Sequence, residues 1–481
     1  MLNYTSSWSL SSSGYYDARL RRQQLYRKHA TRHKERHFPF HRLPLEIIAE
    51  IFVLCLPDFG VIEITECFES REPAPLLLCK VSSSWRSLAL SIPRLWNELS
   101  IEIANPKVDI DLATAMVDGW IARSGELPLS LRLHCYGWKE KEKATAMVQA
   151  HLNTFFRYAS RWESVDISLS GCYCSAVSLP KFDPTPLLRK FSYSTLYSVS
   201  IPFPFTSCPL LSSITWPFSC FVTSNRDPVI PWHQLTHIDL KHAMTTHQTL
   251  DILRTCQTLV EFNVEIDDHL SLDRVRSRRK PVENRSLRSF QISGTQTCSG
   301  LLQSLTLPAL TDFSLDTDYH SLDYISPRSV HTQLLRLFTR SKCKLEKLRL
   351  ENCGFDDART LKCLKHDSCS SLTGLQIWNE YDQPMFTDIV IRALTDNDGL
   401  PEDNNVLLPH LSCLSLEMCV SASPGVLGLM IIKRCLWWNE DDQLKSLSLI
   451  VTNDLDDIDG AFLKIAKESG LDVEIINMGR D

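Results

Sequence analysis

The chain has 481 residues, of which 43% are apolar and 22% are charged, and its formal net charge is −6. This composition fits several domains or one long repeat array. It excludes global disorder and glycine-rich architectures, since only 16 residues are glycine. The charge is uneven: residues 1–42 hold nine Lys or Arg against two acids, a net charge of +7, whereas the rest of the chain carries −13. A mildly acidic body is not expected to bind nucleic acid.

The lengths of the apolar runs and the number of cysteines indicate in which cellular compartment the protein is expected. The run Ile51–Leu56 is far short of the ~20 residues that a membrane-spanning helix needs, so we expect no membrane partner. The N-terminus lacks the basic-then-apolar order of a signal peptide. The 17 cysteines are odd in number and scattered, which favours reduced, buried thiols in a cytoplasmic and/or nuclear protein.

Residues 1–41 are predicted to be a disordered basic segment, because they hold too few apolar residues to bury a face. Their basic stretch, Arg19–Arg36, is either a solvated tail or a nuclear import signal or acidic-partner contact. Histidines recur there every four residues, at His29, His33, His37 and His41. The intervening Arg and Lys repel cations and Pro39 interrupts a helix, so this pattern favours a solvated tail over a metal site.

Residues 42–98 contain two apolar runs at helical spacing. The first begins after Leu43 and Pro44, where Pro44 suits the first helical position, and Pro57 ends it. The acidic segment 57–75 is predicted to be a loop. The second run is expected to be one helix and consists of Leu76, Leu77, Leu78, Val81, Trp85, Leu88 and Ala89.

These residues resemble an F-box. The matching positions are Leu43-Pro44 with Glu46-Ile47-Ile48, Ile51-Phe52, Leu78-Cys79-Lys80-Val81, Trp85-Arg86 and Pro93-Arg94-Leu95-Trp96. The segment departs from the family pattern in its longer acidic insertion and in Ser82, where a cysteine is common. The resemblance implies that residues 42–98 dock a Skp-type adaptor, which bridges to a cullin–RING ubiquitin ligase. By family position the adaptor-binding candidates are Leu43, Pro44, Ile47, Ile48, Ile51, Phe52, Leu78, Val81, Trp85 and Leu88. About half are expected to face the adaptor and the rest to form the domain's own core. Trp85 and Trp96 could instead pin the F-box to the first repeat, which is the preferred interpretation for Trp96.

Beyond residue 98 a unit of the form apolar-x-x-apolar-x-apolar recurs. Seven of the ten intervals between successive units lie between 23 and 28 residues, which chance matches would not produce. The first residues of the units are Trp162, Leu188, Leu211, Leu235, Leu259, Leu287, Leu310, Leu345, Leu372, Leu411 and Leu444. Two earlier segments, starting at Trp96 and Leu127, fit in part. Cys353 and Cys419 complete the leucine-rich-repeat signature after the units at 345 and 411.

The repeat predicts its own architecture. The last two apolar positions of a unit are two residues apart and so point to one side of a strand. One unit cannot bury that side alone, but stacked units form a parallel sheet backed by helices, for example over 245–256 and 331–340. The predicted fold is therefore α/β: a small all-α F-box followed by an irregular leucine-rich-repeat-like solenoid over 99–481, with a parallel sheet and outer helices. Exposed residues that alternate with the leucines are Lys347, Arg349, Gln376 and Ser415; most such side chains are only solvated, so none is predicted as a site.

No enzyme template is present. The chain has no phosphate-binding loop, dinucleotide fingerprint, zinc-protease helix or nucleophile elbow, and no catalytic, cofactor or metal site is predicted. Cys172 and Cys174 are too few to hold zinc. The segment 454–460 resembles a calcium loop but lacks ligands at its ends, so it is predicted to be a solvated turn. The basic segment 276–280 is interpreted as a surface loop without function, with a nuclear import signal or a patch for an acidic partner as the alternatives.

Taken together, the order of the two regions looks like that of F-box/leucine-rich-repeat proteins, notably the large fungal families. The hypothesis is a substrate-recognition subunit of a Skp–cullin–F-box ubiquitin ligase, without chemistry of its own, whose repeats recruit an unknown protein substrate. The alternative is a repeat scaffold outside any ligase, in which the F-box-like helices cap the N-terminal end of the solenoid. The exposure of the apolar residues between 43 and 88 would discriminate the two.

Overall fold

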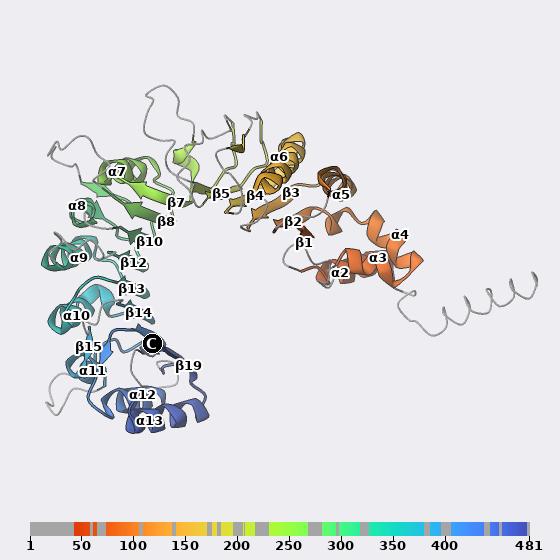
Figure 1. Ribbon diagram of the computed structural model, residues 1–481. Coiled ribbons are helices and arrows are strands. Elements are labelled where there is room, and N and C mark those ends of the chain that lie inside the picture. The colour runs from red at the N-terminus through yellow and green to blue at the C-terminus, as the bar shows by residue number, and fades with distance from the viewer. Residues whose placement is uncertain are drawn as a thin grey trace, which may run out of the picture. The chain divides into compact units, whose positions relative to one another are not determined.

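The computed structural model is an α/β protein (Figure 1). It describes residues 43–57, 61–64, 74–104, 109–136, 141–170, 176–179, 184–195, 205, 207–216, 230–267, 281–294, 298–317, 327–379, 385–395, 406–436, 443–451 and 455–478. The described residues fall into two compact units. The smaller comprises 43–57, 61–62, 74–100 and 115–127, and the larger contains almost everything after residue 128.

The smaller unit is mainly helical. Its elements are α2 (Leu45–Leu54), α3 (Leu76–Val81), α4 (Ser83–Ser91), the 3-10 turn η2 (Pro93–Leu95) and the last part of α5 (Ile110–Arg123). The first predicted helix is present, although Pro44 caps it rather than occupying its first turn.

The prediction of one helix over the second apolar run is wrong. Ser82 is extended (φ −159°, ψ 166°) and separates α3 from α4. Its Oγ accepts a hydrogen bond from the backbone N–H of Trp85 at 3.1 Å, which makes Ser82 the N-cap of the new helix. The predicted loop over 57–75 also contains a strand, β1 (Val61–Ile64).

Tryptophans hold the smaller unit together. The rings of Phe52 and Trp85 lie 4.9 Å apart and join α2 to α4. Trp96 is buried, donates from Nε1 to the carbonyl of Ala89 at 2.9 Å, and meets the ring of Trp120 on α5 edge-on at 4.9 Å. Trp96 therefore packs inside the smaller unit, against a helix that follows residue 98 in the chain.

A fifteen-stranded sheet has the order β1-β2-β3-β4-β5-β6-β7-β8-β10-β12-β13-β14-β16-β18-β19. The strands after β1 are β2 (Glu98–Ile103), β3 (Leu129–Cys135), β4 (Trp162–Leu169), β5 (Lys190–Thr195), β6 (Ser213–Trp216), β7 (His237–Met244), β8 (Glu261–Ile266), β10 (Ser289–Ser293), β12 (Asp312–Asp316), β13 (Lys347–Glu351), β14 (Gly374–Trp378), β16 (Cys413–Glu417), β18 (Ser446–Val451) and β19 (Asp472–Asn477). Every pairing described from β3 to β19 is parallel. Two small parallel pairs lie outside it, β9 (Val282–Glu283) with β11 (Leu305–Thr306) and β15 (Phe386–Thr387) with β17 (Val420–Ser421).

The register explains why the repeat could be recognised. The middle apolar residue of one unit is the direct partner of the middle residue of the next, for example Phe290 with Phe313, Phe313 with Leu348, and Leu348 with Leu375. All four side chains are buried. All eleven predicted units, and the two partial ones, coincide with strands.

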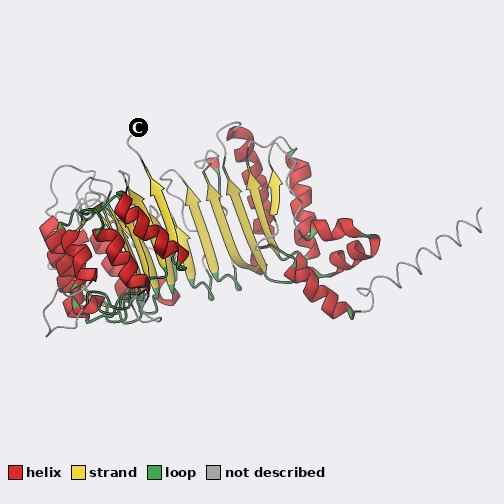
Figure 2. Cartoon of the chain, turned by 90° about the horizontal axis from the view of Figure 1, so that it is seen from below, coloured by secondary structure: helices red, strands yellow, loops and turns green. Residues whose placement is uncertain are grey.

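The helices of the larger unit are α6 (Lys141–Arg157), α7 (Thr246–Thr255), α8 (Cys298–Ser304), α9 (Pro327–Ser341), α10 (Asp357–Leu364), α11 (Asp388–Thr395), α12 (Val426–Leu436) and α13 (Asp457–Glu468). The predicted helices over 245–256 and 331–340 correspond to α7 and α9. Helices α7 to α12 lie along one face of the strands β7 to β18, and no described helix covers the opposite face (Figures 1 and 2). Figure 2 shows the strands of the larger unit side by side.

The two repeat cysteines lie under the sheet. Cys353 and Cys419 are buried, and each thiol lies 3.5 Å from a carbonyl of the preceding strand, that of Leu315 or Ile377. Burial raises the pKa of Cys419 to about 12. These thiols therefore stay protonated and can donate to the backbone carbonyls at the strand ends.

Two charged side chains are also buried in the larger unit. Arg434 on α12 is 1% exposed and donates to the carbonyls of Leu394 (2.9 Å) and Leu408 (2.7 Å). Leu394 lies in the last turn of α11, whose carbonyls lack partners within the helix, so Arg434 caps one helix from the next. On α13, Asp459 accepts from the backbone N–H of Gly428 at 2.6 Å.

The prediction of a solvated turn at 454–460 is wrong for its described part. Asp456 is the N-cap of α13 and accepts from the backbone N–H groups of Ile458 and Asp459 at 2.9 and 3.0 Å. The acidic residues of this segment therefore begin a helix.

Candidate interaction surfaces

The structure divides the ten predicted adaptor-binding residues by exposure. The exposed ones are Leu43, Pro44, Ile47 and Val81; the half-buried ones are Ile51, Trp85 and Leu88; the buried ones are Ile48, Phe52 and Leu78. The buried residues form the core of the smaller unit and are not available to a partner.

Helix α2 has an exposed apolar stripe beside its buried face. Ile47, Ile51 and Leu54 follow one another at intervals of four and three residues, which puts them on one side of the helix, and Leu43 is exposed just before the helix begins. Leu54 is 83% exposed. The helix is apolar on more of its circumference than the core of the unit can cover, so the stripe remains in contact with solvent.

Helices α3 and α4 add to this exposure. Leu77 and Val81 are one helical turn apart on α3 and both are exposed, as is Leu90 on α4. We call the following residues the exposed apolar set: Leu43, Leu45, Ile47, Leu54, Leu77, Val81 and Leu90. Four of these seven, at positions 45, 54, 77 and 90, were not among the predicted residues. The apolar runs in the sequence contain Leu54 and Leu77, but they do not indicate which side of each helix is buried in the core.

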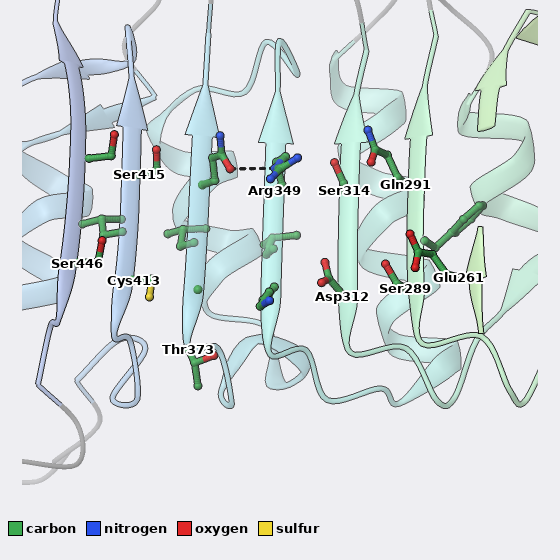
Figure 3. Close-up of a pocket in the computed structure, with 18 of the residues that line it drawn as sticks. Glu261, Ser289, Gln291, Asp312, Ser314, Arg349, Thr373, Cys413, Ser415 and Ser446 are labelled. Carbon is green, nitrogen blue, oxygen red and sulfur yellow. Dashed lines mark hydrogen bonds between the residues drawn. The ribbon is translucent and has the colours of Figure 1, made fainter. Parts of the chain in front are cut away.

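The open face of the sheet carries a second candidate site, a groove of about 500 Å³ across the strands β8 to β18 (Figure 3). The four residues that the sequence placed on the outside of the strands all line it: Lys347, Arg349, Gln376 and Ser415. Their alternation with the buried leucines could be predicted from the sequence, but the fact that all four line one groove could not.

The floor of the groove consists of small side chains. They are Ser289, Ser314, Gly374, Cys413, Ser415, Ser446 and Ser448. Ser314 is only 7% exposed, and its hydroxyl has no hydrogen-bond partner within the described part of the chain. A buried hydroxyl without a partner is a cost to the fold.

Charged groups divide the groove by strand. Glu261 on β8 and Asp312 on β12 flank Ser289 on β10, as Figure 3 shows. The cations Lys347 and Arg349 follow on β13, and the lining of β14, β16 and β18 is uncharged. From β8 to β18 the groove is thus acidic, then basic, then neutral.

A hydrogen-bonded chain fixes Arg349. Its Nε donates to Oε1 of Gln376 at 2.9 Å, the bond drawn in Figure 3, and Gln376 Nε2 donates to Oε1 of Glu417 at 2.9 Å. Ser415 Oγ donates to the same carboxylate oxygen at 2.9 Å. Each side chain in this chain restricts the next, so Arg349 is oriented before any ligand binds.

Acidic residues continue beyond the groove at the carboxyl ends of the strands. Burial, followed by the nearby charges of Asp316 and Glu417, raises the pKa of Glu351, although Arg349 opposes the shift. Like charges are therefore crowded along this edge.

Several predicted features cannot be placed. The basic segment 1–41 with its histidines, the pair Cys172 and Cys174, and the segment 276–280 lie outside the described residues. Across the ranges that are described, no three His, Cys, Asp or Glu side chains are grouped so as to hold a metal ion. None of the described helices has the length and apolar composition needed to cross a membrane.

No protein-family model matches this chain, and none of the curated proteins matches it. The interpretation of the two surfaces therefore rests on their own chemistry and on the motif resemblance.

Proposed function

We propose that this chain is the substrate-recognition subunit of a Skp–cullin–F-box ubiquitin ligase, in which the smaller unit is an F-box that docks a Skp-type adaptor. The observation that carries the proposal is the exposed apolar set on α2, α3 and α4. These helices coincide with the segments that resemble the F-box, and the exposed apolar set includes three of the ten family positions, Leu43, Ile47 and Val81.

The physical reason is the cost of leaving these side chains in water. Burying a leucine or isoleucine side chain is worth about 1.5–3 kcal/mol, so seven exposed ones represent a large unused binding energy. Short helices that present apolar side chains at intervals of three and four residues fit helix-in-groove recognition. Such a set marks an interaction site more often than a surface meant for solvent.

In this proposal the larger unit is a leucine-rich-repeat-like solenoid that holds a protein substrate near the ligase's transfer machinery. The chain itself is not an enzyme; it acts by proximity. It works in the cytoplasm and/or the nucleus, with the adaptor, the cullin–RING ligase and a protein substrate as its partners.

A repeat scaffold outside any ligase is the second candidate. The burial of Ile48, Phe52 and Leu78, and the packing of Trp96 on Trp120, fit a terminal cap. A cap, however, does not need Leu54 and Leu77 in solvent, which is why the exposed apolar set favours adaptor docking.

The test is capture of the full-length chain by a purified Skp-type adaptor. Wild type should bind stoichiometrically. Ile47→Asp and the double variant Leu43→Ala/Pro44→Ala should reduce capture by at least about tenfold, the equivalent of 1.4 kcal/mol. Ile389→Asp is the matched control, because Ile389 is equally exposed but lies on α11 of the larger unit.

Circular dichroism should show that all variants are folded. No capture of a folded wild-type chain, or equal losses in Ile47→Asp and Ile389→Asp, would overturn the ligase proposal and leave the scaffold.

A further inference from the structure

The groove on the open face has a charge order that a ligand must match. We infer that it binds an extended polypeptide segment that crosses the strands, with a basic residue over β10, an acidic residue over β13 and small residues over β14 to β18. This inference rests on the proposed function in that it names the class of substrate that the larger unit would recruit.

The basic residue follows from the two carboxylates. Glu261 and Asp312 stand on the strands either side of Ser289, so a Lys or Arg side chain above Ser289 lies between two negative charges. Neighbouring strands are about 4.8 Å apart, which puts both carboxylates within one side-chain length of that position. Neither carboxylate has an ion-pair partner within the described residues.

The acidic residue follows from β13. Lys347 is the register partner of Asp312 but forms no ion pair in the part of the chain that is described. Arg349 is held in place by Gln376. Two cations at alternate positions of one strand, one of them pre-oriented, form a receptor for a carboxylate.

The length of the groove is independent of charge. Its lining residues lie on the strands from β8 to β18, which are neighbours in the sheet, so the groove crosses six strand intervals, about 29 Å. A single ion would contact only a small part of that length. This favours a polypeptide over a single ion.

The glycine at the centre sets the depth. A side chain at Gly374 would begin 3.4 Å from Cγ of Lys347, so glycine leaves the space that the lysine stem occupies. Beyond it the serines of β16 and β18 are short, and a chain can approach the sheet closely only with small residues of its own.

The geometry also gives the spacing of the charges. From β10 to β13 there are two strand intervals, about 10 Å, and an extended chain rises about 3.3 Å per residue. The basic and acidic residues of the ligand are therefore about three positions apart. The whole groove, from β8 to β18, spans about nine residues.

The experiment is selection from an array of peptides of about ten residues by the full-length protein without adaptor. Two positions, three apart, are fixed as basic–acidic, acidic–basic, both basic or both acidic, and the others are randomised. Both opposite-sign classes are included, because a chain can cross the strands in either direction. We expect opposite-sign peptides to be enriched at least tenfold over same-sign peptides.

Charge reversal in the protein sharpens the test. The double variant Lys347→Glu/Arg349→Glu should switch the selection to peptides with two basic residues, and Glu261→Lys/Asp312→Lys should switch it to peptides with two acidic ones. A gain of a new preference cannot come from unfolding. Lys464→Glu on α13 is the matched control and should select as wild type does.

Equal enrichment of all classes, no enrichment, or an unchanged preference in Lys347→Glu/Arg349→Glu would overturn the inference. Because the array contains no adaptor, it is independent of the capture experiment. Capture with no peptide selection refutes only the ligand class, and selection without capture refutes only the ligase role.

Discussion

The two units place their side chains in different ways. The strands from β3 to β18 in the larger unit bury most of their apolar residues, and this unit also buries a guanidinium, Arg434, and a carboxyl group, Asp459. The smaller unit leaves the exposed apolar set in solvent on or next to three helices. Both buried polar groups have backbone partners; the Arg434 guanidinium stabilises the fold, whereas ionisation of the Asp459 carboxyl opposes it. In the smaller unit the exposed apolar side chains have no such role in the fold, so they are available for binding.

The difference predicts which property a mutation should change. Replacing a buried polar group of the larger unit should change the free energy of unfolding. Replacing an exposed apolar side chain on the surface of the smaller unit should change the affinity for a partner. Three stability measurements test this distinction.

The largest effect is expected from Arg434→Leu. The change leaves the buried carbonyls of Leu394 and Leu408, among others, without their donor, and unmet buried groups cost about 1–3 kcal/mol each. We expect a loss of about 4 kcal/mol in the free energy of unfolding by urea, followed by circular dichroism. Arg392→Leu, an exposed arginine on α11, is the control and should lose less than about 1 kcal/mol. Similar losses in both variants would show that the buried guanidinium has no special role.

An effect of intermediate size and opposite sign, a gain in the free energy of unfolding, is expected from replacing Asp459. Burial, with the neighbouring Asp456, raises the pKa of Asp459 to about 6, whereas in the unfolded chain it is about 3.9. Between about pH 4 and pH 6 the unfolded chain is ionised while the folded chain is still protonated, so the free energy of unfolding falls as pH rises through this window.

The variant Asp459→Asn removes that dependence and keeps an oxygen acceptor for the N–H of Gly428. We expect it to be more stable than wild type at pH 7 by about 1–2 kcal/mol, and the two to converge near pH 4. Asp459→Ala removes the acceptor as well and should gain less. A wild-type stability that is flat from pH 4 to pH 6 would count against the shifted carboxyl.

The smallest effect on stability is expected from Leu54→Ser. Leu54 is almost fully exposed, so the variant should change the free energy of unfolding by no more than about 0.5 kcal/mol while weakening adaptor capture. The matched buried change, Leu348→Ser on β13, should cost about 3 kcal/mol or more. If Leu54→Ser destabilised the chain as strongly, the exposed apolar set would belong to the fold.

Much of the sheet could be predicted because a parallel, in-register stack repeats one position in every unit. Phe290, Phe313 and Leu348 are read from the sequence as equivalent, and they are neighbours in space. β19 was not predicted from the sequence because its apolar spacing differs from that of the other units: Leu471 lies two residues before Val473, whereas the first two apolar residues of the other units are three apart. The break between helices at Ser82 was not predicted because the helical spacing of apolar residues continues across it.

The candidate sites were less predictable. Helical spacing places Ile47 and Ile48 together in an apolar run, but only the packing of the helices decides that the first is exposed and the second buried. The groove depends on contacts such as that between Gln376 and Glu417, which lie 41 residues apart across an irregular insertion. No local pattern carries such a contact, so the network around Arg349 had no signal in the sequence.

The distribution of thiols offers a way to observe both surfaces in one molecule. Of the described cysteines, only Cys55 and Cys413 are exposed: the first follows Leu54 at the end of α2, and the second lies in the floor of the groove. Elsewhere in the described chain the thiols are buried or half-buried, and burial slows their reaction with labelling reagents. A chain that retains one of these two thiols, and in which Cys67, Cys172, Cys174 and Cys220 outside the described residues are replaced, accepts a fluorophore at a native position, with no engineered cysteine. A dye at position 55 would then report on adaptor docking, and a dye at position 413 on ligand entry.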